Sequence, residues 1–260
     1  MDDSQNQKNN QTPTVPPPAE AGQVRVAFHV APIKPTVTYV VMALTVVFYG
    51  LQQLSTYLTG YDLPYILGGK VNELILQGQV WRLLTPILLH GSILHILFNM
   101  YALYAFGPGL ERYYGHWRYL LLYLLGGYCG NVLSFMFSAN PSIGASTAIF
   151  GLVAAEAVFI YRNRMLYGDK AKGMLINLSV VVAVNLAFGM QSGIDNWGHL
   201  GGLLGGLVFA WVAGPNFKVQ QTLNGLELKD VHSTHEAWWG FLLAGGLASA
   251  IVIGKMIVGQ

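Results

Sequence analysis

Long apolar stretches separated by short polar loops decide what this chain can fold into. Hydrophobic residues make up 53% of the 260 residues and charged residues only 10%, whereas soluble domains carry about 25% charged residues. About 20 apolar residues in a helix cross a bilayer core. We therefore expect an all-α polytopic membrane protein. The stretches are 36–58, 92–106, 117–137, 146–161, 174–190, 197–212 and 238–258.

Lysine and arginine are distributed unevenly between the loops. With a cytoplasmic N-terminus, the external loops receive only Lys70, Arg82 and Lys255. The internal parts receive Lys8, Arg25, Lys34, Arg112, Arg118, Arg162, Arg164, Lys170, Lys172, Lys218 and Lys229. Basic residues favour the cytoplasmic side. We therefore expect a cytoplasmic N-terminus and an external C-terminus. Our expected location for this multi-pass protein is a prokaryotic cell membrane. The second, fourth and sixth stretches then run from outside to inside.

The same pattern divides the chain into four parts. Residues 1–35 are polar and rich in Asn, Gln and Pro, which predicts a disordered cytoplasmic tail. Residues 36–213 hold a core of six helices. Residues 214–237 form a cytoplasmic linker, and residues 238–260 contain a seventh transmembrane helix.

The first loop, residues 59–89, is long and amphipathic. We expect it to form helix that lies partly in the outer membrane interface. Trp81 and Arg82 suit that level, with the indole ring at the headgroups and the guanidinium towards lipid phosphate.

Polar residues open three of the apolar stretches. His95 and Asn99 are four residues apart in the second, so they share one helix face. Ser146 begins the fourth stretch, and His199 lies near the start of the sixth. Polar groups in apolar helices are costly and usually mark function or helix contact. Each residue alone is explained by a bond to a neighbouring helix, but their shared depth on all three helices favours a common site.

The surroundings of Ser146 fit a nucleophile. Pro141 and Gly144 predict an irregular approach to the helix. In a first helical turn the backbone N–H groups lack partners within the helix, and they can stabilise an oxyanion. The alternative is that Ser146 only caps the helix, since serine is a preferred N-cap residue. The motif alone leaves both interpretations open.

Small residues predict how the serine and the histidine could meet. Gly198, Gly202 and Gly206 repeat every fourth residue around His199, and Gly151 lies on the fourth stretch. Such faces let two helix backbones approach closely. We expect the fourth and sixth helices to pack on these glycines, which would bring Ser146 within hydrogen-bond reach of His199.

Several other chemistries lack support in the sequence. No H-E-x-x-H motif is present, so a zinc-hydrolase helix is not indicated. The single cysteine, Cys129, can form neither an internal disulfide nor a cysteine metal cluster. The basic residues form no broad face, which argues against nucleic acid. No repeats or lines of charge indicate a transporter.

Taken together, these residues resemble the rhomboid family of intramembrane serine proteases, over about residues 36–213. The resemblance rests on Trp81-Arg82, His95 with Asn99, Glu111-Arg112, Gly144-Ala145-Ser146 and Gly198-His199-x-x-Gly202-x-x-x-Gly206. It implies a six-helix core, here with an added C-terminal helix, and a catalytic dyad of Ser146 and His199 without an acidic third member. It also implies an oxyanion hole formed by His95, Asn99 and the backbone N–H of Ser146.

The resemblance further implies the partners. Substrates would be single-span membrane proteins, cut near the outer end of their transmembrane segment within the bilayer. No metal or cofactor is implied, and the oligomeric state stays open. Two positions depart from the family pattern: Thr147 follows the serine where glycine is frequent, and Phe150 stands where some members carry tyrosine. The main alternative is a non-catalytic relative that binds transmembrane clients, and a small-solute transporter is the weaker one.

Overall fold

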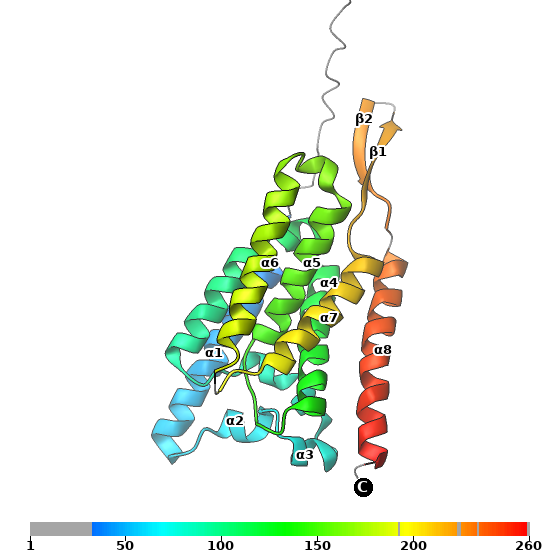
Figure 1. The fold of residues 1–260 in the computed structure, drawn as a ribbon. Coiled ribbons are helices and arrows are strands. Elements are labelled where there is room, and N and C mark those ends of the chain that lie inside the picture. The colour runs from blue at the N-terminus through cyan, green and yellow to red at the C-terminus, as the bar shows by residue number, and fades with distance from the viewer. Residues whose placement is uncertain (1–32, 192, 223–224, 233, 259–260) are drawn as a thin grey trace, which may run out of the picture.

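The computed structural model describes residues 33–191, 193–222, 225–232 and 234–258. Its helices lie side by side in an elongated bundle, with a β-hairpin at one end (Figure 1). The mostly helical fold expected from the sequence is confirmed. The prediction of a disordered tail over residues 1–35 falls almost wholly outside the described residues.

Six helices make up the bundle. They are α1 (Thr36–Thr59), α4 (Ile93–Phe137), α5 (Ser146–Arg162), α6 (Lys170–Phe188), α7 (Asn196–Ala213) and α8 (Thr234–Val258). By length and composition, α1, α4, α6 and the His235–Val258 part of α8 could each cross a membrane. Helices α5 and α7, which carry Ser146 and His199, have 17 and 18 residues. The exact count of six core spans plus one therefore remains a prediction.

Helix α4 corrects the predicted boundaries of the second and third stretches. It contains two helical segments joined at Gly115, whose φ of 75° and ψ of 160° are not helical. The first segment does not stop at residue 106 but continues to this break, through Pro108.

Glu111 explains why the helix can continue beyond the predicted end. Its side chain is fully buried, which would be costly for an unpartnered carboxylate. The two carboxylate oxygens accept hydrogen bonds from the backbone N–H groups of Val37 (2.8 Å) and Thr38 (2.7 Å) and from the Thr38 hydroxyl (2.6 Å). The carboxylate therefore stabilises the first turn of α1, a long-range contact that the local sequence does not reveal.

The linker over residues 214–237 is not purely irregular, so the prediction of an all-α fold is wrong here. Strands β1 (Phe217–Thr222) and β2 (Gly225–Asp230) pair in antiparallel orientation. Asp230 forms an ion pair with Arg118 at 2.7 Å, which ties the hairpin to α4.

The first loop folds into short helical pieces. They are α2 (Leu63–Gly68), α3 (Asn72–Leu76), η1 (Val80–Leu83) and η2 (Thr85–Leu88). The expected helical character is present, but the prediction for Arg82 is wrong. Its side chain is only 3% exposed, and its guanidinium donates to the carbonyl oxygens of Ile66 and Gly69, both at 2.7 Å. Arg82 therefore cross-links the loop instead of facing lipid phosphate.

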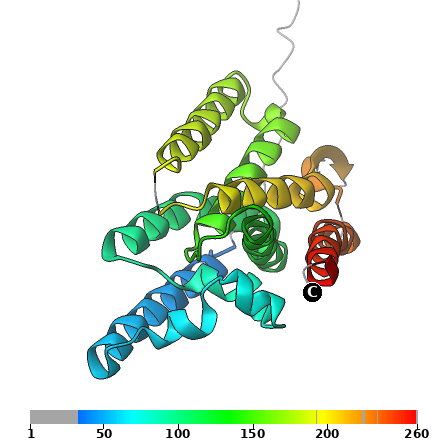
Figure 2. The same ribbon diagram turned by 60° about the horizontal axis from the view of Figure 1, so that its bottom comes forward.

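Helix α7 lies at the centre of the packing and α6 at its edge. Helix α7 contacts α4, α5 and α8, and many of its glycines are buried. By contrast, α6 makes few contacts, mainly with α5, and only Ala171 among its residues is buried. In the turned view α6 stands apart from the other helices, on the side away from α8 (Figure 2).

Candidate functional site

Ser146 and His199 meet where α5 and α7 begin. The Oγ atom of Ser146 lies 3.0 Å from Nε2 of His199, within hydrogen-bond distance. The imidazole is largely buried and stacks on Phe150, with ring centroids 4.2 Å apart and planes 8° apart. Since Phe150 lies one turn after the serine on the same helix, this stacking fixes the imidazole plane relative to Ser146.

The segment that leads into α5 requires a glycine. Gly144 has a φ of 136°, a conformation that L side chains rarely adopt. A Cβ atom at this position would lie 2.7 Å from Nε2 of His95. The N–H of Gly144 donates to the Pro86 carbonyl at 2.9 Å. This backbone therefore brings the approach to Ser146 directly against the His95 ring.

The first turn of α5 places backbone N–H groups beside the serine. The N–H of Ile149 makes the first bond of the helical ladder, to the carbonyl of Ala145 at 3.0 Å. The amides of residues 146–148 precede that ladder, as at any helix start. Their N–H groups and the helix dipole favour negative charge at this point.

His95 and Asn99 lie at the start of α4, but neither is hydrogen-bonded to Ser146 among the described residues. His95 packs its ring edge-on against His90, with centroids 4.9 Å apart. Asn99 is buried, and its Nδ2 donates to the His95 carbonyl at 3.0 Å. That bond uses one of the two amide hydrogens, so the second remains for another acceptor.

Lys70 in the first loop holds the segment before Ser146. The backbone of Lys70 pairs with that of Ser142 in both directions, at 3.0 and 3.1 Å. Its ammonium donates to the carbonyl oxygens of Ser138 (2.8 Å) and Asn140 (2.9 Å). Burial lowers the pKa of Lys70 to about 8, while the Asp195 carboxylate acts in the opposite direction. No local pattern predicts this role, since Lys70 is an isolated lysine in a loop.

Asp195 is a second residue that the sequence analysis missed. It is the N-cap of α7, where Oδ1 accepts from the Gly198 N–H at 3.0 Å. Its Oδ2 accepts from the Ser134 hydroxyl on α4. It does not bond the histidine, whose Nδ1 has no hydrogen-bond partner in the described part of the chain. Aspartate before an apolar helical stretch is an N-cap signal that could have identified it.

Glycines bring α5 and α7 into backbone contact below the serine–histidine pair. A Cβ atom on Gly202 would lie 2.0 Å from the Thr147 carbonyl oxygen, and one on Gly206 would lie 2.3 Å from that of Gly151. Neither distance is possible between real atoms, so only glycine fits at these two positions.

The side chain of Thr147 packs into the contact between helices. A Cβ atom added to Gly130 of α4 would lie 2.6 Å from Cβ of Thr147. A Cβ atom added to Gly198 of α7 would lie 3.0 Å from Cγ2 of Thr147. The extra bulk that follows the serine is therefore accommodated by glycines on both neighbouring helices.

Comparison with known proteins shows which proteins this chain is similar to. The profile of one family, the Rhomboid domain, matches residues 77–216. The chain is 43% identical over 182 residues to "Rhomboid protease GluP" of Bacillus subtilis (strain 168), covering 70% of this chain and 35% of that protein. It is 35% identical over 155 residues to "RHOMBOID-like protein 9, chloroplastic" of Arabidopsis thaliana, covering 59% and 36%.

A third relative, "RHOMBOID-like protein 4" of Arabidopsis thaliana, is 38% identical over 146 residues, which cover 56% of this chain and 37% of that protein. The chain thus spans about a third of the length of these relatives, 35–37%. The region matched by the family profile, residues 77–216, includes His95, Asn99, Ser146 and His199, whereas Lys70 precedes it.

Proposed function

Because this chain belongs to the rhomboid family of integral membrane proteins, we propose that it is an intramembrane serine endopeptidase with Ser146 as nucleophile and His199 as its base. One observation carries the proposal: Oγ of Ser146 lies 3.0 Å from Nε2 of His199, at the start of two closely packed helices. The decisive experiment compares wild-type and Ser146→Ala protein on a single-span membrane substrate.

The proposed reaction proceeds in two steps. His199 Nε2 removes the proton from Ser146 Oγ as the oxygen attacks the substrate carbonyl carbon, and the tetrahedral intermediate forms. The imidazolium then gives that proton to the leaving amine, the C–N bond breaks, and an ester on Ser146 remains. A water molecule attacks the ester with His199 again as base, which releases the carboxylate product and the free serine.

Negative charge on the substrate oxygen would be stabilised by donors at the start of α5. The Ser146 N–H precedes the helical ladder, and His95 lies against Gly144, two residues before the serine. Asn99 has one amide hydrogen beyond its bond to the His95 carbonyl. We assign all three groups to the oxyanion hole.

Asn99→Ala and His95→Ala test this assignment. We expect each to lower kcat more than it changes KM, because an oxyanion contact strengthens in the transition state. Loss of one such donor typically costs roughly a hundred- to thousandfold in rate. Steady-state kinetics on a single-span substrate in proteoliposomes would measure both constants. Unchanged rates in both variants would remove these residues from the mechanism.

Asp195 is proposed to position His199 through the helix start. Asp195→Ala removes the cap at Gly198 and the bond to Ser134, and loss of an N-cap costs about 1 kcal/mol of stability. We expect a lower melting temperature and a lower kcat.

The conservative variant Asp195→Asn separates positioning from charge. It keeps an oxygen acceptor for the Gly198 N–H, so it should recover most of the activity lost in Asp195→Ala. If Asp195→Asn were as inactive as the alanine variant, the charge and not the cap would be what matters.

The remaining features of the proposal concern the membrane. The distribution of basic residues supports a cytoplasmic N-terminus and an external C-terminus. In this orientation the dyad would lie near the outer surface. Water and substrate would enter from that side, bordered by the first loop. Helical peptide bonds are shielded, so we expect cleavage of single-span proteins where Gly or Pro loosens the helix and small residues flank the cut bond.

A further inference from the structure

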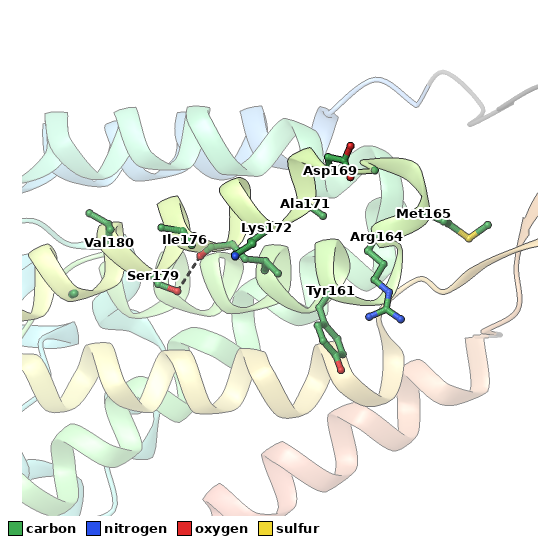
Figure 3. Close-up of a pocket in the computed structure, with 12 residues that line it drawn as sticks. Tyr161, Arg164, Met165, Asp169, Ala171, Lys172, Ile176, Ser179 and Val180 are labelled. Carbon is green, nitrogen blue, oxygen red and sulfur yellow. Dashed lines mark hydrogen bonds between the residues drawn. The ribbon is translucent and has the colours of Figure 1, made fainter.

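A groove runs between α5 and α6 at the end of α5 that is farthest from Ser146. It has a volume of about 1000 Å³. Its walls come from the end of α5, the turn that follows, and one face of α6 (Figure 3). Ser146 and Arg162 begin and end α5, so the groove opens about 24 Å from the serine at helical rise. It is therefore separate from the proposed active site.

The end of the groove near the α5–α6 turn is basic. Arg164 and Lys172 both line it and are exposed. Neither side chain has a hydrogen bond or ion pair within the described ranges. Asp169 is the one acidic residue in the lining, so the positive charge is in excess. The neighbouring Arg162 is engaged elsewhere, with its guanidinium 5.0 Å from the ring centroid of Trp211.

The rest of the groove is apolar and has the length of one membrane leaflet. Along α6 the lining continues from Lys172 through Ile176 and Val180 to Ala183. At helical rise this distance is about 17 Å, and half of a hydrocarbon core is about 15 Å. Ser179 adds no free polar group, since its hydroxyl donates to the Leu175 carbonyl at 2.9 Å (Figure 3).

We propose that this groove binds an anionic phospholipid. The phosphate lies between Arg164 and Lys172, and one acyl chain lies along the apolar face of α6. Basic pockets between transmembrane helices favour anionic lipid headgroups in this way, and the unpartnered charges and leaflet-long lining fit both parts of such a molecule. The lipid fills space that protein leaves open, because α6 is otherwise attached only loosely to α5.

Lipid retention tests the headgroup contact. The purified full chain in detergent is titrated with phosphatidylglycerol or with phosphatidylcholine of the same chains, and bound lipid is counted by native mass spectrometry. We expect wild type to bind phosphatidylglycerol in preference. The double variant Arg164→Gln/Lys172→Gln should bind it roughly thirtyfold more weakly, from two basic contacts at the membrane surface. Lys170→Gln is the matched control, because Lys170 lies on the same turn but outside the lining.

A second pair of variants tests the acyl-chain contact. Ser179→Trp fills the groove and should reduce binding of phosphatidylglycerol. Val181→Trp places the same bulk on the opposite face of α6 and should not. Melting temperatures establish that all variants are folded.

Three outcomes would overturn the proposal. Equal binding of the two lipids would remove the role of the headgroup, and an equal loss in Lys170→Gln would show nonspecific charge attraction. If a single-span substrate displaced the lipid, and the double variant bound phosphatidylglycerol as well as wild type does, the groove would be a substrate site. None of these readouts depends on proteolysis, so they stand apart from the proposed activity.

Discussion

Ser146→Ala and His199→Ala should each abolish cleavage of a single-span substrate while leaving the fold intact. The serine hydroxyl is the atom that attacks, and the histidine Nε2 at 3.0 Å is its base. Loss of either group should lower the rate by on the order of 10⁴-fold or more. Product formation would be measured in proteoliposomes, with the melting temperature of each variant recorded to establish folding.

The two residues act as a unit, which gives a further test. The double variant should be little worse than either single variant. A mechanism-based serine reagent should label Ser146 in wild type and fail to label it in His199→Ala. Substantial cleavage by folded Ser146→Ala protein would refute the proposed mechanism. Absence of both cleavage and labelling in folded wild-type protein would instead favour a relative that binds transmembrane clients without cutting them.

Gly202→Val should lower both stability and activity. A Cβ on Gly202 would lie 2.0 Å from the Thr147 carbonyl oxygen, a backbone atom that cannot rotate away, so α5 and α7 must separate. Overpacking typically costs about 1–3 kcal/mol, and displacing catalytic groups by about 1 Å can cost on the order of a hundredfold in rate. Differential scanning fluorimetry and the cleavage assay would measure the two effects.

Gly246→Val is the matched control. Gly246 lies in α8, and a Cβ there would meet nothing within 4 Å, so the same substitution should change neither property. If Gly202→Val melted and cleaved like the control, close packing of α5 on α7 would not be needed to hold the dyad together.

The sequence predicts those features that depend on local pattern. Apolar length and composition locate the helices, and Ser146 and His199 stand out because polar residues are rare in such stretches. The irregular approach to the serine was also expected from Gly144, a residue that can adopt the φ of 136° found there.

Features that depend on distant contacts were missed or mispredicted. Arg82 looked like an interfacial residue, because no sequence pattern marks the carbonyl oxygens of Ile66 and Gly69 as its partners. The sequence analysis ended the second stretch before Glu111, where a charged residue follows the apolar run. It could not show that Glu111 accepts hydrogen bonds from backbone N–H groups of α1, which lies far away in the sequence. Lys70 was not identified because its partners, the carbonyl oxygens of Ser138 and Asn140, are also distant in the sequence.

The separation of the serine and the histidine along the chain has a consequence for biogenesis. The contact joins residues 53 positions apart, and α6 lies between them. A chain that is still being inserted has its nucleophile in the membrane before its base has been made. A protease assembled in this order would be unable to cut while it emerges beside other nascent membrane proteins. The proposed activity would begin only when α7 has packed against α5, so assembly of these two helices would be the step that switches it on.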